Sequence, residues 1–398
     1  MTLFDKLGLT AARLEGAGEG AVPFDTVIEA VLSPTEVTID GRRTLMCGSN
    51  NYFGLSFHPE VIAASTAALA REGTGTTGSR AANGTYSGHR RLEQAFADAY
   101  GMRRAQIFTT GYQANVGVIS GLCGPGDVVL LDIESHASIY DGARLSGANF
   151  FAFRHNSPDD LRRKLSRQLD PQRCLVVVEG LYSMSGDVAP VAAFAEVCRE
   201  CDAFLMVDEA HSFGAYGRRG LGRAEEQGVL DRVDFIVGTF SKTLAGIGGF
   251  CVSNHDELKL LHFTSRPYVF TASASPASVA GVEAALRIVT REPGLRDRLW
   301  ANIRRARAGL AAAGFEIGAT ESPIVPVKIG AAERAIQFWR TLLMHGIYVN
   351  LVLPPATHPD NCLLRTSYSA AHRADEIDRA VAVFAEVGRA LSIIPTPA

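Results

Sequence analysis

Residues 174–210 read CLVVVEGLYSMSGDVAPVAAFAEVCRECDAFLMVDEA. An apolar run that ends at Glu179 is followed by a loop, a segment of helical period and a second apolar run that ends at Asp208. Continuous apolar runs joined by an amphipathic helix are typical of buried parallel strands. The segment therefore predicts a β-α-β unit in a mainly parallel sheet with helices on both faces.

The same alternation extends over the middle of the chain. Further apolar runs occupy 105–111, 128–134 and 234–240, and segments such as 157–169 have helical period. Each run ends in polar or glycine residues. Because ligands bind at the carboxyl ends of the strands in such sheets, we expect these residues to gather at one ligand-binding edge.

After residue 280 a long helical stretch leads into short strands and a closing helix. We therefore predict an α/β chain with three parts: an N-terminal arm at 1–45, a large domain at 46–280 and a smaller C-terminal α+β domain at 281–398. The arm is expected to contain a helix and a short hairpin around Asp40-Gly41.

Composition argues against several classes of protein. The 398 residues include 39 Lys and Arg against 42 Asp and Glu, so the formal net charge is −3 and no nucleic-acid partner is expected. No apolar run approaches 18 residues, which predicts no membrane-spanning helix. The first residues lack the features of a secretory signal. We expect a cytoplasmic protein.

The seven cysteines are odd in number and scattered, which does not suggest a disulfide framework. Cys198 and Cys201 form a CxxC pair in a helical segment, without a second pair or a nearby histidine. Buried thiols are favoured over a redox or zinc site, and no metal is predicted.

Two nucleotide-binding patterns are incomplete. Residues 73–78, GTGTTG, match GxGxxG but follow a helical segment instead of the strand that a dinucleotide site requires. A close-packed loop, for instance at a subunit interface, is favoured. Lys242-Thr243 follows a strand as in a phosphate loop, but Ser241 and Ile236 replace the required glycines.

Lys242 at this strand end has two interpretations. One is a surface lysine at a strand-helix junction. The other is a desolvated lysine held as a Schiff-base amine, which the surrounding small and apolar residues favour.

Other strand ends carry complementary groups. Asp208 is either a helix cap or a functional carboxylate, and His211 is either a core histidine or a ligand-binding one. His136 follows another strand, and Gly111-Tyr112 open a helix whose free amides suit a phosphate. Together with Lys242 these groups match the needs of pyridoxal 5′-phosphate.

The motif order GTGTTGSRAANGT, GYQAN, DIESHASIYDG, EGLYSMSGDVAP, DEAHSFGAYG and GTFSKTLAGIGGF resembles the α-oxoamine synthases over nearly the whole chain. That family has the fold-type I architecture of pyridoxal-phosphate enzymes, with a large mainly parallel sheet domain and a smaller C-terminal domain. The segments RHNSPDDL, RPYVFTAS and LLRTSYSAAH are most similar to its bacterial serine palmitoyltransferase branch.

The resemblance implies a role for each matching residue. Lys242 would hold the cofactor as a Schiff base, Asp208 would pair with its ring nitrogen, and His136 would stack on the ring and meet the substrate. The remaining cofactor contacts would come from Gly111, Tyr112, Ser183, His211, Thr239, Ser241 and, across a subunit interface, Thr271. Asn51 and Arg365 would meet the amino-acid substrate.

The reaction implied is a decarboxylative condensation of L-serine with a long-chain acyl thioester, carried by coenzyme A or an acyl carrier protein. The product would be 3-ketodihydrosphingosine, the first intermediate of sphingolipid synthesis. The resemblance also implies a homodimer with shared active sites and at most peripheral membrane association. Leu353 replaces an arginine usual in that branch before the PPAT motif, which leaves strict serine specificity open.

Three alternatives remain. One is a sister activity within the family: 8-amino-7-oxononanoate synthase, glycine C-acetyltransferase or 5-aminolevulinate synthase. Another is a non-catalytic subunit of the same fold, which the presence of Lys242, Asp208 and His136 disfavours. A third is a nucleotide-binding protein, which rests on GTGTTG alone.

Overall fold

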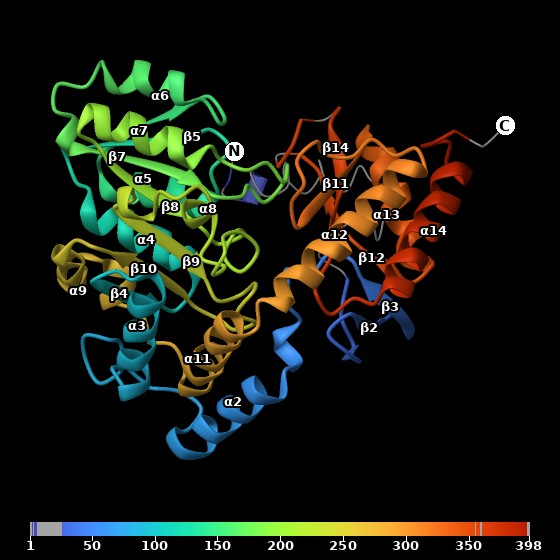
Figure 1. Ribbon diagram of the computed structural model, residues 1–398, viewed down its shortest axis with the longest axis horizontal. Helices are drawn as coiled ribbons and strands as arrows, with labels where there is room; N and C mark the ends of the chain where they lie inside the picture. Colours follow the sequence, from blue (N-terminus) through green and yellow to red (C-terminus); the bar gives the residue numbers. More distant parts are fainter. Residues whose placement is uncertain (1, 3, 6–25, 355, 359, 396–398) are drawn as a thin grey trace. The chain divides into compact units, whose positions relative to one another are not determined.

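The structure is a computed structural model that describes residues 2, 4–5, 26–354, 356–358 and 360–395 (Figure 1). The chain divides into two compact units. The large unit comprises Asn51–Ser183 and Asp187–Asp297, and the small unit comprises Met1–Asn50, Met184–Gly186 and Arg298–Ala398. The helix predicted in the N-terminal arm lies outside the described residues.

The large unit is built on a seven-stranded sheet. In spatial order its strands are β4 (Arg104–Phe108), β10 (Gly249–Ser253), β9 (Phe235–Thr239), β8 (Phe204–Asp208), β7 (Cys174–Glu179), β5 (Val128–Asp132) and β6 (Asn149–Phe153). Strands β9, β8, β7, β5 and β6 pair in parallel, whereas β10 is antiparallel to both β9 and β4. The predicted mainly parallel sheet is confirmed.

Helices surround this sheet. They are α2 (Pro59–Glu72), α3 (Ser87–Tyr100), α4 (Gly111–Leu122), α5 (Ala137–Ser146), α6 (Pro158–Leu165), α7 (Val191–Cys201), α8 (Arg223–Glu226), α9 (Leu261–Thr264), α10 (Arg266–Val269) and α11 (Pro276–Arg291). Leu175 and Val177 of β7 join a core with residues of α4 and α5, while Val176 and Val178 point to the other face and are also fully buried. Both faces are therefore covered, as the apolar runs predict.

Over residues 26–395, with the gaps given above, the small unit is built from two sheets and the helices α12, α13 and α14. One sheet has the order β1 (Ala30–Val31), β2 (Glu36–Ile39), β3 (Arg42–Met46) and β12 (Ile347–Tyr348), and the other β11 (Ile324–Gly330), β14 (Cys362–Ser367) and β13 (Asn350–Val352). The helices are α12 (Gly294–Ala312), which begins in the large unit, α13 (Ala332–Met344) and α14 (Ala374–Ala390).

Two local predictions can be compared with this structure. The hairpin at Asp40-Gly41 is confirmed: β2 pairs antiparallel with β3, and both turn residues have positive φ, as a tight hairpin turn requires. The long helical stretch predicted after residue 280 is confirmed as helical but is divided into two helices, α11 and α12. The break falls at Glu292-Pro293, because proline has no amide hydrogen to donate within a helix.

No helix among the described residues has both the length and the apolar character to cross a bilayer.

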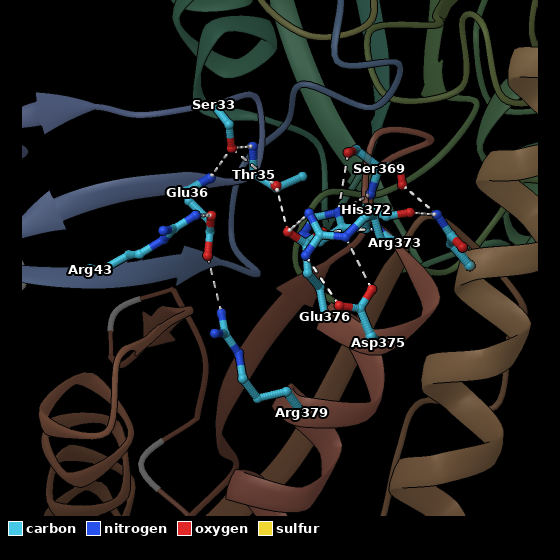
Figure 2. Close-up of polar contacts among 11 residues, drawn as sticks. Ser33, Thr35, Glu36, Arg43, Ser369, His372, Arg373, Asp375, Glu376 and Arg379 are labelled. Carbon is cyan, nitrogen blue, oxygen red and sulfur yellow. Dashed lines mark hydrogen bonds and ion pairs between the residues drawn. The ribbon is translucent and has the colours of Figure 1, made fainter.

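A polar cluster ties the first strands to the last helix of the small unit (Figure 2). The carboxylate of Glu376 at the start of α14 accepts hydrogen bonds from the hydroxyl of Thr35 (3.3 Å) and the backbone amide of Arg373 (2.8 Å), and it pairs with the Arg373 guanidinium (3.0 Å). Nearby, Arg379 of α14 donates to Glu36 of β2 (3.4 Å). These contacts explain why residues so distant in sequence form one unit.

We predict that Glu376→Ala destabilises the small unit. Removing the buried carboxylate leaves the Thr35 hydroxyl and the Arg373 amide without this acceptor, at a cost of about 1–3 kcal/mol. Asp378→Ala is the control, because its carboxylate lies on the same helix but makes an exposed pair with Arg305 and should matter little. Urea unfolding followed by circular dichroism compares them, and equal midpoints would contradict the anchoring role.

Candidate active site

A cavity of about 310 Å³ lies at the carboxyl ends of β7, β8 and β9 in the large unit. Its volume is in the range of small-ligand sites. The predicted residues that line it are Gly111, Tyr112, His136, Asp208, His211, Thr239, Ser241 and Lys242. Polar residues at these strand ends therefore lie together at one edge of the sheet, as the sequence predicts.

Asp208 lies at the end of β8 and is 5% exposed. Its carboxylate accepts hydrogen bonds from the side-chain amide of Asn115 (2.7 Å) and the backbone amide of Ala210 (2.8 Å). Residues 209–222 form turns and bends, so no α-helix follows for Asp208 to cap. These two fixed donors hold the buried carboxylate and orient it in the cavity.

Lys242 lies three residues beyond the end of β9, partly buried, and lines the cavity instead of the outer surface. The turn that carries it is braced by Thr239, whose hydroxyl donates to the carbonyl of Gly248 (3.1 Å) and lies 2.9 Å from the hydroxyl of Ser241. The same cavity therefore holds an amine and a carboxylate.

His136 precedes α5 as its N-cap. Its Nδ1 accepts the backbone amide of Ser138 (3.2 Å), and its own backbone amide donates to the carboxyl group of Glu179 (2.5 Å). Burial lowers the pKa of His136, with the charge of Lys242 acting in the same direction and that of Asp208 opposing it. Near neutral pH the imidazole is therefore uncharged, and because Nδ1 is an acceptor, Nε2 carries the proton.

The start of α4 forms an anion-binding corner of the cavity. Thr110 caps the helix, with its hydroxyl accepting the backbone amide of Gln113 (3.1 Å). A Cβ atom at Gly111 would lie 2.7 Å from the Cβ and the hydroxyl oxygen of Thr239, so no larger residue fits. The first amides of a helix have no intrahelical acceptor and suit a phosphate.

Several residues that line the cavity received no role from the sequence, and Asn115 and Glu179 are the most informative of them. Asn115, which holds Asp208, lies four residues after Gly111 and so on the same face of α4, a spacing that could have revealed it. Glu179 ends β7 directly opposite Asp208 in the sheet. Burial, reinforced by the charge of Asp208, raises the pKa of Glu179 well above its usual range.

His211 is 6% exposed, and its imidazole contacts Tyr52, a tyrosine with no exposed surface. The Tyr52 hydroxyl lies 2.8 Å from Nδ1 of His211. Tyr52 was not among the residues predicted from the sequence.

Four predicted residues do not line the cavity. Ser183, Asn51 and Thr271 belong to the large unit, where the amide of Asn51 donates to Ser56 (2.6 Å) and Thr271 accepts from Gln113 (3.4 Å). Arg365 belongs to the small unit: it is buried on β14, and its guanidinium donates to the side-chain oxygen of Asn50 (3.0 Å). Their roles stay predictions.

The sequence patterns set aside above have ordinary structural explanations. GTGTTG begins at the C-terminal cap of α2, where no strand precedes it. Cys198 is buried inside α7, and burial raises the pKa of its thiol. All seven cysteines are free thiols.

Comparisons with known proteins agree with this geometry. The aminotransferase class I and II family matches residues 44–384. A serine palmitoyltransferase of Caulobacter vibrioides is 52% identical over 99% of this chain and 98% of its own length, and one of Sphingomonas paucimobilis is 44% identical over 97% and 93%. A solved structure described as serine palmitoyltransferase with a pyridoxal-phosphate internal aldimine matches with a TM-score of 0.96 at 44% identity, covering 99% of this chain and all of that one.

Behind Asp208, the fully buried Glu209 accepts the backbone amides of Arg223 (2.9 Å) and Ala224 (2.8 Å) and the hydroxyl of Ser212. Burial raises the pKa of Glu209 to about 7, although these donors act in the opposite direction.

We predict that Glu209→Gln flattens the pH dependence of stability. A carboxyl pKa that rises from 4.5 to about 7 on folding stabilises the fold below pH 4.5, and up to about 3 kcal/mol of this is lost as the pH rises through 7. Glutamine resembles the protonated acid and should remove that loss. Thermal unfolding between pH 4.5 and 8 provides the measurement, with exposed Glu257→Gln as the control; an unchanged slope in Glu209→Gln would show that Glu209 is ionised throughout.

Proposed function

Because the chain belongs to the aminotransferase class I and II family, and within it to the α-oxoamine synthases, we propose that it condenses L-serine with a long-chain acyl thioester such as palmitoyl-CoA. The products are 3-ketodihydrosphingosine, the free thiol and carbon dioxide. The similarity to serine palmitoyltransferases over nearly the whole chain supports this activity. The observation that carries it in the structure is one cavity that holds Lys242, Asp208 and His136 together.

The cavity residues fit pyridoxal 5′-phosphate, the cofactor of this family. Gly111 leaves room for a phosphate against the free amides of α4, a lysine amine lines the same cavity, and a buried carboxylate lies at its base. When bound, the cofactor supplies an electron sink for the electron pair left on the substrate α-carbon. We assign its covalent attachment to Lys242 and its remaining contacts to Tyr112, Ser183, Thr239, Ser241 and, from a partner subunit, Thr271.

Asp208 holds a proton on the ring nitrogen. Its carboxylate is fixed by Asn115 and by the backbone amide of Ala210, so it cannot turn away from that nitrogen without losing both bonds. An opposite charge 4 Å away is worth about 4 kcal/mol at an effective dielectric of 20, enough to raise a pKa by about three units. Asp208 would thereby keep the ring nitrogen of a bound cofactor protonated near neutral pH.

Lys242 and His136 act on the substrate. The amine of Lys242, when it is not bonded to the cofactor, would act as the general base that removes the α-proton of serine in this cavity. His136 presents a proton on Nε2 while uncharged, which allows it to stack on a flat ring and to donate to the serine carboxylate. Holding that carboxylate determines which bond of the α-carbon is broken.

To Arg365 and Asn51 we assign the contacts with serine that the family resemblance implies. The guanidinium of Arg365 is buried and held by Asn50, which prepares it for a carboxylate. Leu353 lies just before the PPAT motif, whose Pro355 is outside the described residues, and it offers no charge to the substrate. This absence of charge is the observation that favours a second candidate, a sister α-oxoamine synthase that takes glycine or alanine.

We also propose a homodimer with active sites shared across the interface. Phe270, next to Thr271, is 74% exposed in the single chain, as expected for a residue that a second copy covers. The acyl donor is carried by coenzyme A or an acyl carrier protein. We further propose a cytoplasmic location, and the long acyl chain of the substrate suggests at most peripheral association with a membrane.

Product analysis tests the activity. The holoenzyme is incubated with palmitoyl-CoA and serine, alanine or glycine, and mass spectrometry identifies the ketone formed. We expect serine to give the 3-keto long-chain base, Lys242→Ala to give no product and no visible cofactor absorption, and exposed Lys259→Ala to behave as wild type. Preferred turnover of glycine or alanine would favour the sister activity, and normal turnover by Lys242→Ala would refute the assignment.

Gly111→Ala tests the phosphate corner. Its methyl group would collide with Thr239 and displace the start of α4, so the dissociation constant for pyridoxal 5′-phosphate should rise about tenfold or more. Gly124→Ala is the matched control, because a Cβ there meets only one atom, at 3.9 Å. Absorbance titration of both apoproteins measures the affinities, and equal values would exclude a phosphate at this helix end.

A further inference from the structure

The contact between Tyr52 and His211 joins two buried residues far apart in the sequence. Tyr52 precedes the short 3-10 helix Leu55–Phe57, and His211 follows β8. The hydroxyl-to-Nδ1 distance is 2.8 Å, and the ring planes are tilted by 55° with centroids 6.2 Å apart. The tilt and spacing show that the rings meet through the hydroxyl and are not stacked face to face.

This contact occupies one of the two imidazole nitrogens. A neutral imidazole has one nitrogen that donates and one that accepts. A phenol is a good donor, and its oxygen is a poor acceptor because its lone pairs are shared with the ring. The stable arrangement is therefore Tyr52 O–H donating to Nδ1, which places the imidazole proton on Nε2.

The other imidazole edge belongs to the cavity. His211 lines the cavity, while Tyr52 is not among its lining residues. Tyr52 therefore lies behind the histidine, in the position from which second residues orient metal-binding and catalytic histidines. Since Tyr52 has no exposed surface, water does not compete for this hydrogen bond.

We propose that Tyr52 is a positioning residue that fixes His211 in the Nε2-protonated form, so that the histidine presents a hydrogen-bond donor to the ligand in the cavity. Given the proposed function, on which this part of the inference rests, the acceptor is the ring oxygen of pyridoxal 5′-phosphate. Tyr52 itself touches neither cofactor nor substrate. If Tyr52 contributed only packing, the ring proton of His211 could lie on either nitrogen.

The tautomer can be measured in the apoprotein. Selective ¹⁵N labelling of histidine distinguishes protonated from unprotonated ring nitrogens through their couplings to the carbon-bound ring protons, at pH 8, where unperturbed histidines are neutral. His211→Gln identifies the His211 signals by their disappearance. We expect wild-type His211 to carry its proton on Nε2 and Tyr52→Phe to give a mixture of tautomers.

Tyr100→Phe is the matched control. Tyr100 is also buried in the large unit, and its hydroxyl donates to the carbonyl of Leu221 (3.0 Å) away from the cavity. This variant loses a comparable buried hydrogen bond and should leave the His211 signals unchanged. A wild-type proton on Nδ1, or identical His211 spectra in wild type and Tyr52→Phe, would overturn the proposal; the wild-type result stands even if the variant folds poorly.

A second readout separates this inference from the proposed function. Titration with pyridoxal 5′-phosphate should show affinity about five- to tenfold weaker for Tyr52→Phe than for Tyr100→Phe, as expected for one lost ordering bond. The pH at which the cofactor absorption changes should also shift only in Tyr52→Phe. Equal affinities and equal titrations would refute an effect of Tyr52 on the ligand, whereas failure of wild type to bind the cofactor would refute the proposed function and leave the measured tautomer intact.

Discussion

A charged carboxylate at the end of a buried strand is the constraint on which the site depends. Asp208 is almost inaccessible to water, so its charge must be compensated by fixed donors, and Asn115 and the amide of Ala210 supply them. Asn115 can donate because α4 begins beside the end of β8, and the amide of Ala210 can donate because the chain turns sharply after β8. The sheet order, the first turn of α4 and the loop after β8 therefore have to form together for the carboxylate to be tolerated.

The neighbouring strand adds a second constraint. Glu179 lies opposite Asp208 in the parallel register, so two carboxyl groups end adjacent buried strands. Both cannot be charged at low cost, and the raised pKa of Glu179 shows that it is the protonated member. The pair then carries one negative charge, which would match the single cationic ring nitrogen of the proposed cofactor. The protonated carboxyl group of Glu179 still accepts a hydrogen bond from the backbone amide of His136. Glu179 thus shapes the site without adding a second charge to it.

The sequence predicts the parts of this structure that depend on local pattern. Five buried strands and the polar residues at their ends follow from continuous apolar runs, and the hairpin follows from Asp40-Gly41. Strands β6 and β10 were not predicted: the apolar run of β6 is only four residues long, Phe150 to Phe153, and β10 follows β9 without an intervening helix. Tyr52 could not be found this way, because its partner lies 159 residues further on and only the folded chain brings them together.

Three titratable groups around the site, His136, Glu179 and Glu209, have pKa values that shift on folding. Burial lowers the pKa of His136, so its contribution to stability is complete above pH 6.5 and declines as the pH falls below that value. The raised pKa values of Glu179 and Glu209 act in the opposite sense, because protonation of either favours the folded chain and that benefit declines as the pH rises. Between pH 4.5 and 6.5 the histidine and the two carboxyl groups therefore change the stability in opposite directions, so their effects partly cancel.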